Sequence, residues 1–231
     1  TIRDLLTHRA GLYDARRIVG EAKNLLDWDE VTERLAAAAP GDRGPRSSYH
    51  ALTYGHLVGN VVARVSGMSL SRFVETELRA PLGLDGFHIG APPEAIAHAA
   101  RLMRGPRREG PRPRKKPNAA LRMVAPFFDE FRAALLPTGM ARFDMSSDEA
   151  LAASIPAANG LFTARALARF YAMLAEGGTL DGKRYLGSET LAEATRPYVR
   201  GGDRVLLFPL AWRLGYHRVG ALSRHRAPLA Y

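Results

Sequence analysis

Apolar residues recur every three or four positions along most of the chain, a spacing that predicts amphipathic helices. Gly or Pro follows the end of several of these stretches, as expected where a helix stops. The predicted helices cover residues 1–12, 27–39, 53–65, 69–80, 163–175 and 187–197, with one more near 146–152.

Several helix ends carry local signals. Thr1 and Asp4 stand at the spacing of a capping box, although Asp replaces the usual Glu, and Gly11 is placed to end that first helix. Ser69 and Thr163 are expected to cap later helices. The helix that begins after Ser69 should stop before Pro81.

The segments with strand-like sequence are short, and most of them lie near the C-terminal end of the chain. Residues 85–90 can form a short strand, and residues 203–220 have the apolar and aromatic content of strands. Strands and helices do not alternate, and no repeat appears. The pattern predicts an α+β fold in which helices are grouped apart from a sheet.

The length of 231 residues is enough for one sizeable core. No run of eighteen apolar residues occurs, so we expect no integral membrane segment. The chain begins at Thr1 without a leader-like pattern, and we interpret it as the interior of a longer protein whose N-terminus is missing. The compartment stays open, with the cytoplasm slightly favoured.

The net charge of +10 is concentrated in one segment. Residues 101–116 hold eight basic residues and one acidic residue, interspersed with Pro and Gly. We interpret residues 104–117 as a basic loop or lid. Because the run has no aromatic residue, we do not expect nucleic-acid binding. The Arg and Ala content suggests a bacterial source.

Common catalytic motifs are absent from the sequence. It has no Gly-x-Ser-x-Gly, no Ser-x-x-Lys, no nucleotide-binding glycine loop and no His-Glu-x-x-His. It also has no cysteine, which excludes disulfides and a thiol nucleophile. We therefore predict no metal site and no cofactor.

Some aromatic residues allow two interpretations. Phe127, Phe128 and Phe131 could line a pocket, but packing in the core is the preferred interpretation. Trp212 could flank a substrate or pack in the sheet, and packing is again preferred. His8 is explained by a helix end, where a cation is favourable.

Tyr49 stands just before the predicted helix 53–65. From the residues alone, it is either a packed aromatic side chain with its hydroxyl bonded to backbone, or a phenol that moves a proton.

Four phrases, taken in order, decide between these alternatives. They are "TIRDLLTHRAGL", the segment 47–90 that starts "SSYHALTYGHLVGN", "IPAANGLFTARALARFYAMLAEGG" and "LAWRLGYHRVG". Together they resemble the serine β-lactamase-like family of class C β-lactamases, DD-peptidases and family VIII carboxylesterases. The resemblance is strongest to its esterase-like members and runs from Thr1 to about Gly220.

The resemblance implies a β-lactamase/penicillin-binding-protein-like fold, here mainly the helical region with sheet strands at the C-terminal end. It implies hydrolysis of small-molecule esters through an acyl-serine, and it places Tyr49 at the catalytic tyrosine of the family's Tyr-x-Asn motif. Asn159 and Gly160 correspond to a loop that borders the active-site cleft, although Asn-Gly is also an ordinary turn sequence. His50 and Ala51 complete the expected substrate-binding positions.

Two departures from the family qualify this prediction. Ala51 replaces the motif's Asn, which favours simple esters over amides. The Ser-x-x-Lys motif and a clear third motif are absent, and residues 221–231 form a tail that no longer resembles the family. We therefore interpret residues 1–231 as an incomplete hydrolase domain that is inactive as given, because its nucleophile lies outside this chain. The alternative is a catalytically inactive binding protein on the same scaffold.

Overall fold

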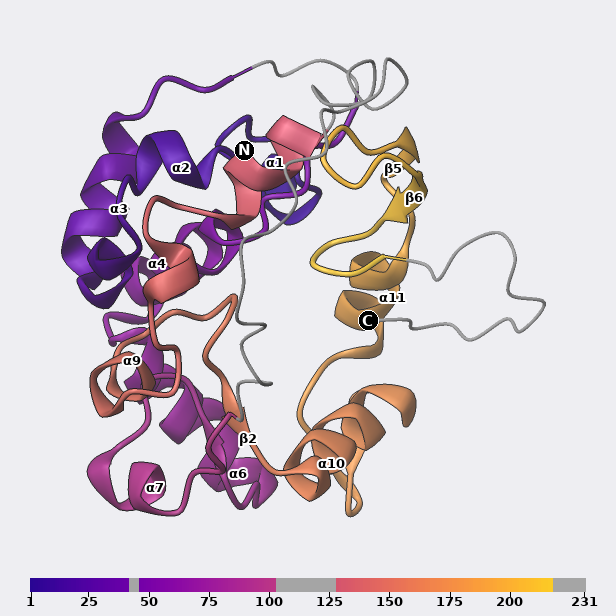
Figure 1. Ribbon diagram of the computed structural model, residues 1–231. Coiled ribbons are helices and arrows are strands. Elements are labelled where there is room, and N and C mark those ends of the chain that lie inside the picture. Colours follow the sequence, from indigo (N-terminus) through magenta and orange to yellow (C-terminus); the bar gives the residue numbers. More distant parts are fainter. Residues whose placement is uncertain (42–45, 103–127, 218–231) are drawn as a thin grey trace.

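The computed structural model describes residues 1–41, 46–102 and 128–217. Helices α1 to α4 lie in the upper part of the view in Figure 1, and the chain then passes through α6, α7 and α9 below. It returns through α10 and α11 to the hairpin β5–β6, which lies beside α1. Segments near both ends of the chain therefore meet, and the amide of Gly215 donates to the carbonyl of Leu6 at 3.1 Å.

Helices make up most of the regular structure. The α-helices are α1 (Ile2–Leu6), α2 (Ala15–Ile18), α3 (Trp28–Ala37), α4 (Thr53–Ser66), α5 (Leu70–Phe73), α6 (Ala80–Leu82), α7 (Pro93–Ala97), α9 (Asp148–Ala152), α10 (Ala164–Ala175) and α11 (Ser188–Thr195). The shorter helical turns are η1 (Ala22–Leu26), η2 (Val74–Arg79) and η3 (Met140–Arg142), and residues 128–135 are helical as well.

The strands form three antiparallel pairs among the described residues. These are β1 (Phe87–His88) with β2 (Leu161–Phe162), β3 (Thr179–Leu180) with β4 (Lys183–Arg184), and β5 (Val199–Gly202) with β6 (Pro209–Trp212). In the longest pair, Val199 lies opposite Trp212 and Gly202 opposite Pro209. The α+β prediction is confirmed.

Most of the predicted helix caps are confirmed. Thr1 and Asp4 form both hydrogen bonds of a capping box at α1. Ser69 accepts from the amide of Arg72 at 3.3 Å, and Thr163 accepts from that of Ala166 at 3.1 Å. Each cap acts within three residues, so a local sequence signal was sufficient.

Two predicted boundaries were wrong. The first helix ends at Leu6 rather than near Gly11, because the chain turns at His8, whose φ is +57°. The helix after Ser69 widens into the π-helical turn η2 and continues into α6, which contains Pro81 near its start.

Buried apolar residues form three clusters. One joins α5, α6, β1 and α10: Leu70, Val74, Leu82, Leu84, Phe87, Ala166, Met173, Leu174 and Leu180. A second joins the N-terminal helices to the loop after α9: Ala15, Ile18, Val19, Leu25, Val31, Leu35, Leu52 and Ile155. The third lies on the β5–β6 hairpin, where Tyr49 packs against Val199, Leu210 and Trp212.

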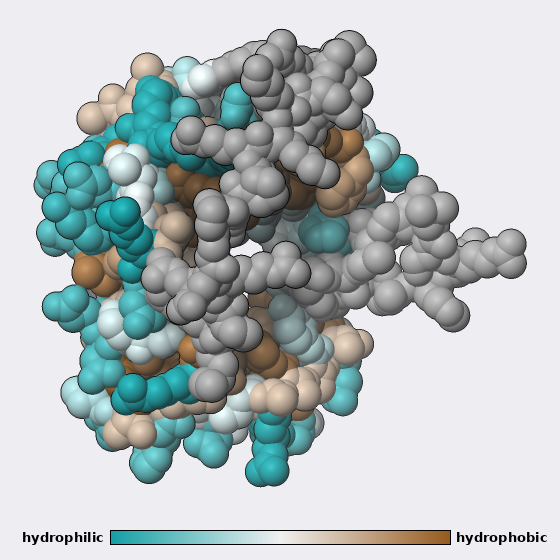
Figure 2. All heavy atoms as spheres, viewed as in Figure 1, coloured by the Kyte–Doolittle hydropathy of each residue, from teal (hydrophilic) through white to brown (hydrophobic). Residues whose placement is uncertain are grey.

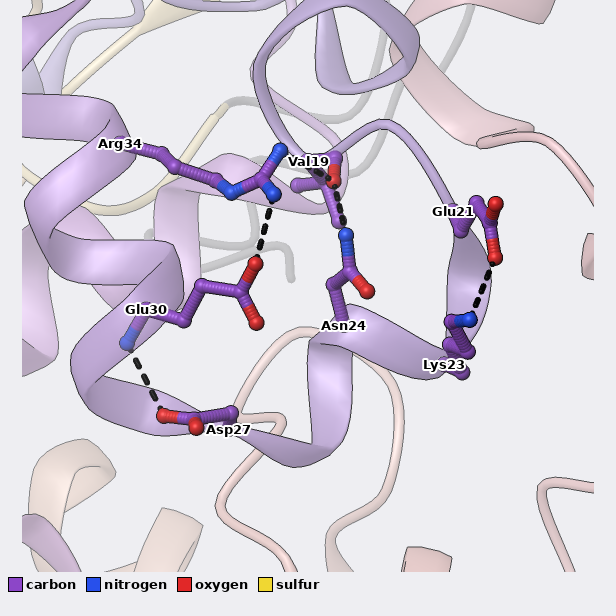
Figure 3. Close-up of polar contacts among 7 residues, drawn as sticks. All are labelled: Val19, Glu21, Lys23, Asn24, Asp27, Glu30 and Arg34. Atoms are coloured by element: carbon purple, nitrogen blue, oxygen red, sulfur yellow. Dashed lines mark hydrogen bonds and ion pairs between the residues drawn. The ribbon is translucent and has the colours of Figure 1, made fainter.

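Polar contacts fix the path from α2 to α3 (Figure 3). The carbonyl of Val19 accepts from the Asn24 side chain at 2.9 Å and from Arg34 at 3.3 Å. Asp27 caps α3 through the amide of Glu30, and Glu30 pairs with Arg34 at 2.6 Å. These bonds position the second cluster, on which α4 rests.

Polar residues cover much of the outer surface, with apolar areas between them (Figure 2). Phe128 is 49% exposed and Phe131 is 38% exposed. The preferred interpretation of these two residues as core was therefore wrong. The basic segment 104–117, Phe127 and the tail 221–231 lie outside the described residues.

Helix α4 buries a histidine in its first turn. His56 is 0% exposed, its ring lies 5.0 Å from that of Trp28, and its ring nitrogens have no hydrogen-bond partner among the described residues. Burial lowers the pKa of His56 to about 4, an effect that the nearby Leu52 carbonyl only partly offsets. The folded protein therefore holds this ring neutral.

We expect the pH dependence of stability to report this histidine. Because the folded pKa is depressed below 6.5, its contribution is complete above pH 6.5 and is lost as pH falls towards 4. The loss is on the order of 3 kcal/mol. Urea unfolding measures the stability of each protein at pH 7.5 and at pH 4.5. Between these two pH values, His56→Leu should lose less stability than the unsubstituted protein. The control His98→Gln, at an exposed histidine, should lose as much stability as the unsubstituted protein. An equal loss of stability in His56→Leu would contradict the prediction.

Candidate active site

Tyr49 lies in the short segment that leads into α4, between rings from both ends of the chain. Its ring is stacked with that of Trp212, at a centroid distance of 5.9 Å and an interplanar angle of 11°. The ring of His8 lies 5.1 Å away. The aromatic side chain is therefore packed on more than one side, which restricts its rotation.

The hairpin β5–β6 and the turn between its strands hold the same segment by hydrogen bonds. The indole Nε1 of Trp212 donates to Ser47 Oγ at 2.7 Å, and the amide of Arg204 donates to the Ser47 carbonyl at 3.0 Å. The amide of Tyr49 donates to Asp203 Oδ1 at 3.1 Å. Tyr49 is thus tied to residues more than 150 positions later.

Asp203 organises this contact. It is 3% exposed, and its Oδ1 also accepts from the amides of Val205 and Leu206 at 2.9 and 3.0 Å. Its Oδ2 is buried without a hydrogen bond among the described residues. Oδ1 therefore fixes both the turn after β5 and the backbone of Tyr49.

The Tyr49 hydroxyl makes no hydrogen bond to a described residue, and the side chain is half-buried. Burial and, secondarily, the Asp203 carboxylate raise the pKa of Tyr49 above its ordinary value of 10. At neutral pH the phenol is therefore protonated in this environment. It can donate a proton directly, but it needs a nearby cation to act as a base.

His50 is enclosed rather than presented to a ligand. It is 0% exposed; Nε2 accepts from the amide of Leu12 at 3.0 Å, and Nδ1 lies 2.6 Å from the Ser48 carbonyl. Burial lowers the pKa of His50 to about 4, so the ring is neutral. These contacts favour a supporting role, and contact with a substrate stays a prediction.

Asn159 is also occupied within the protein. It is 6% exposed; its Oδ1 accepts from the amide of Ile155 at 3.0 Å, and its Nδ2 donates to the carbonyls of Ala150 and Ala153 at 2.6 Å each. These bonds tie Asn159 to helix α9 and to the loop that follows it. Asn159 therefore shapes the loop rather than pointing its amide outward.

Gly160 follows at an exposed position. A Cβ at this position would lie 2.1 Å from the ring of Phe162, so a larger side chain cannot fit without movement. Neither Asn159 nor Gly160 has a positive φ, so the Asn-Gly turn geometry considered from the sequence was wrong. The preceding residues pack on α4, where a Cβ on Gly55 would lie 2.7 Å from the amide nitrogen of Ala157.

The structure brings together Tyr49, His50 and Ala51 as neighbours in the entry to α4, with Ala51 half-buried in the turn. Sequence reasoning missed His8 and Asp203. The helix-end explanation of His8 as a cation was wrong, because the ring is 4% exposed and burial lowers its pKa well below 6.5. No local signal identified either residue.

A separate cavity of about 1140 Å³ lies by β1, β2 and α7, with Phe87, His88 and Phe162 in its wall. None of the predicted site residues lines it. In the described parts of the chain, no group of three or more acidic, His or Cys side chains could hold a metal. No helix there is long and apolar enough to cross a membrane.

Solved structures with the same architecture define the class. A penicillin-binding protein homologue from Caulobacter crescentus is 32% identical, with a TM-score of 0.77 over 96% of this chain and 56% of its own. A family VIII carboxylesterase is 30% identical, also with a TM-score of 0.77, over 96% of this chain and 55% of its own. The fold is thus β-lactamase/penicillin-binding-protein-like, as the sequence predicted.

The Beta-lactamase family model matches residues 1–225, and the chain belongs to this family. Among curated proteins, the esterase/beta-lactamase LipL of Mycobacterium tuberculosis (strain ATCC 25618 / H37Rv) is 39% identical over 225 residues. The match covers 94% of this chain and 50% of that protein. The chain therefore spans about half the length of the curated relative it matches.

Proposed function

We propose that the protein containing this chain is a serine hydrolase of the carboxylesterase type, with Tyr49 as its proton-transfer residue. Its similarity to a protein named esterase/beta-lactamase and to a family VIII carboxylesterase supports this class. The observation that carries the proposal is the state of Tyr49. Its backbone and ring are held from distant parts of the chain, while its hydroxyl has no partner among the described residues.

The reaction divides between this chain and the rest of the protein. With Tyr49 as the phenolate, a serine hydroxyl attacks the ester carbonyl and its proton passes to the Tyr49 oxygen. Tyr49 then protonates the departing alcohol, which leaves an acyl-serine, and water attacks this ester to release the acid and restore the serine. Because the 231 residues contain no Ser-x-x-Lys, the proposal places the nucleophile and its lysine outside them. The lysine would supply the cation that lowers the pKa of Tyr49 from its raised value.

Ala51 bears on the substrate. A methyl group cannot donate or accept a hydrogen bond, so this position offers nothing to the amide group of a peptide or β-lactam. We therefore propose simple esters as the substrate class. The same residue favours the second candidate, a catalytically inactive binding protein that retains the scaffold.

One experiment separates these candidates. The full-length protein is treated with a fluorescent alkyl phosphonate and assayed with p-nitrophenyl esters of increasing acyl length and with a chromogenic cephalosporin. We expect covalent labelling of one serine, ester hydrolysis blocked by that label, and much weaker β-lactam turnover. Failure of a protein with an intact Ser-x-x-Lys to label or to hydrolyse any ester would favour the inactive binding protein.

A further inference from the structure

His8 contacts the backbone on both sides of Tyr49. Its carbonyl accepts from the amide of Ser48 at 2.8 Å, and its ring Nδ1 accepts from the amide of His50 at 3.1 Å. Asp203 accepts the amide of Tyr49 between them. Three consecutive amides are therefore held by two residues that come from opposite ends of the chain.

The backbone of His8 makes this double contact possible. Its φ is +57°, in the left-handed region that non-glycine residues rarely adopt, with His and Asn among the more tolerant types. The residue is nevertheless buried, at 4% exposure. An uncommon conformation at a buried residue persists only where surrounding contacts hold it, and such residues concentrate at functional sites.

The ring of His8 is also fixed by its neighbours. Its centroid lies 4.1 Å from that of Trp212, 4.6 Å from that of Tyr54 and 5.1 Å from that of Tyr49. Burial, and secondarily the neighbouring His50 and His217, lower the pKa of His8 well below 6.5. A neutral ring whose Nδ1 accepts a hydrogen bond must carry its proton on Nε2.

We propose that His8 is a positioning residue for Tyr49. His8 holds the amides of Ser48 and His50, so that the Tyr49 phenol keeps one place relative to the substrate. This inference rests on the proposed function, because it assigns His8 a purpose in the same reaction. A displacement of about 1 Å in a reacting group can lower a rate by about 100-fold. Loss of the Nδ1 acceptor should therefore reduce kcat while leaving KM little changed.

The chain offers a matched pair of substitutions. In His8→Asn, the amide oxygen can occupy the position of Nδ1, and Asn tolerates the left-handed backbone. In His8→Gln, the amide group lies nearer the position of Nε2, so the acceptor for His50 is lost. Both variants remove the ring. Because Gln tolerates the left-handed backbone less well than Asn, the Ser48 amide, which bonds to the His8 carbonyl, shows whether the backbone has moved; a difference confined to the His50 amide is then due to the lost acceptor. His98→Gln, at an exposed histidine, is the control.

The first measurement needs no variant. Nitrogen chemical shifts of His8 in the ¹⁵N-labelled full-length protein should show an unprotonated Nδ1 and a protonated Nε2. Amide hydrogen exchange then compares His50 with Ser48, whose partner is the His8 carbonyl and survives both substitutions. We expect faster exchange at His50 in His8→Gln only, with Ser48 unchanged and kcat for an ester lowered by about 10- to 100-fold.

Three results would overturn the inference. They are a proton on Nδ1 of His8, unchanged exchange of the His50 amide in His8→Gln, and equal kcat in the Asn and Gln variants. The proposed function fails by a different result, which is the absence of serine labelling and ester hydrolysis in the unsubstituted full-length protein. The tautomer and exchange measurements do not depend on activity, so the two failures are distinguishable.

Discussion

Tyr49→Phe in the full-length protein is expected to lower kcat for ester hydrolysis by about 100- to 10,000-fold, the usual contribution of a positioned acid–base group. The substitution removes only the hydroxyl. The ring can keep its stacking on Trp212, and the backbone amide can keep its bond to Asp203. Because binding contacts of the ring are retained, KM should change much less than kcat.

Stability distinguishes a catalytic from a structural tyrosine. The Tyr49 hydroxyl bonds to no described residue, so its removal should change the free energy of unfolding by less than about 1 kcal/mol. Tyr185→Phe is a suitable control, because its hydroxyl donates to the Pro81 carbonyl at 2.8 Å and it lies in another cluster. The control should leave kcat unchanged. A Tyr49→Phe protein with wild-type kcat would remove Tyr49 from the mechanism.

The sequence predicted features that depend on nearby residues. The capping box of Thr1 and Asp4 and the caps Ser69 and Thr163 each involve residues three apart, so pattern and spacing were enough. The family resemblance supplied the architecture and singled out Tyr49. Both kinds of information describe positions along the chain rather than contacts between distant segments.

The surroundings of Tyr49 could not be predicted in the same way. Asp203 reaches it across 154 positions, and Trp212 reaches Ser47 across 165. The role of His8 depends on a backbone conformation that only the folded contacts maintain. The sequence suggested that His8 is a cation at a helix end, but burial lowers the pKa of His8 and keeps its ring neutral.

The role of Asn159 could not be predicted from the sequence either. Its sequence context suggested a turn or a residue at the cleft, whereas its side chain is buried and stabilises a loop by hydrogen bonds. Asn159→Asp tests those contacts. One carboxylate oxygen can still accept from the amide of Ile155, but the other faces the carbonyls of Ala150 and Ala153, to which the amide nitrogen had donated. Two hydrogen bonds become two repulsive contacts, and we expect a loss of about 3–5 kcal/mol at pH 7.5.

This loss should depend on pH with a defined sign. Burial and the two facing carbonyls raise the pKa of the new carboxyl in the folded state above its unfolded value of about 3.9. The folded state therefore favours the protonated acid, which can donate to one carbonyl again. Urea unfolding of Asn159→Asp, compared with the unsubstituted protein at the same pH, should show a smaller deficit at pH 4.5 than at pH 7.5.

Asn60→Asp is the matched control for this comparison. Asn60 lies on α4 near the wall of a shallow cavity, and its side chain makes no hydrogen bond to a described residue. Its substitution should change stability by less than about 1 kcal/mol, with no comparable trend in pH. A deficit in Asn159→Asp that is equally small, or that grows as pH falls, would mean that the amide is not held by these carbonyls. Asn159 would then be available to a substrate, as the family resemblance implied.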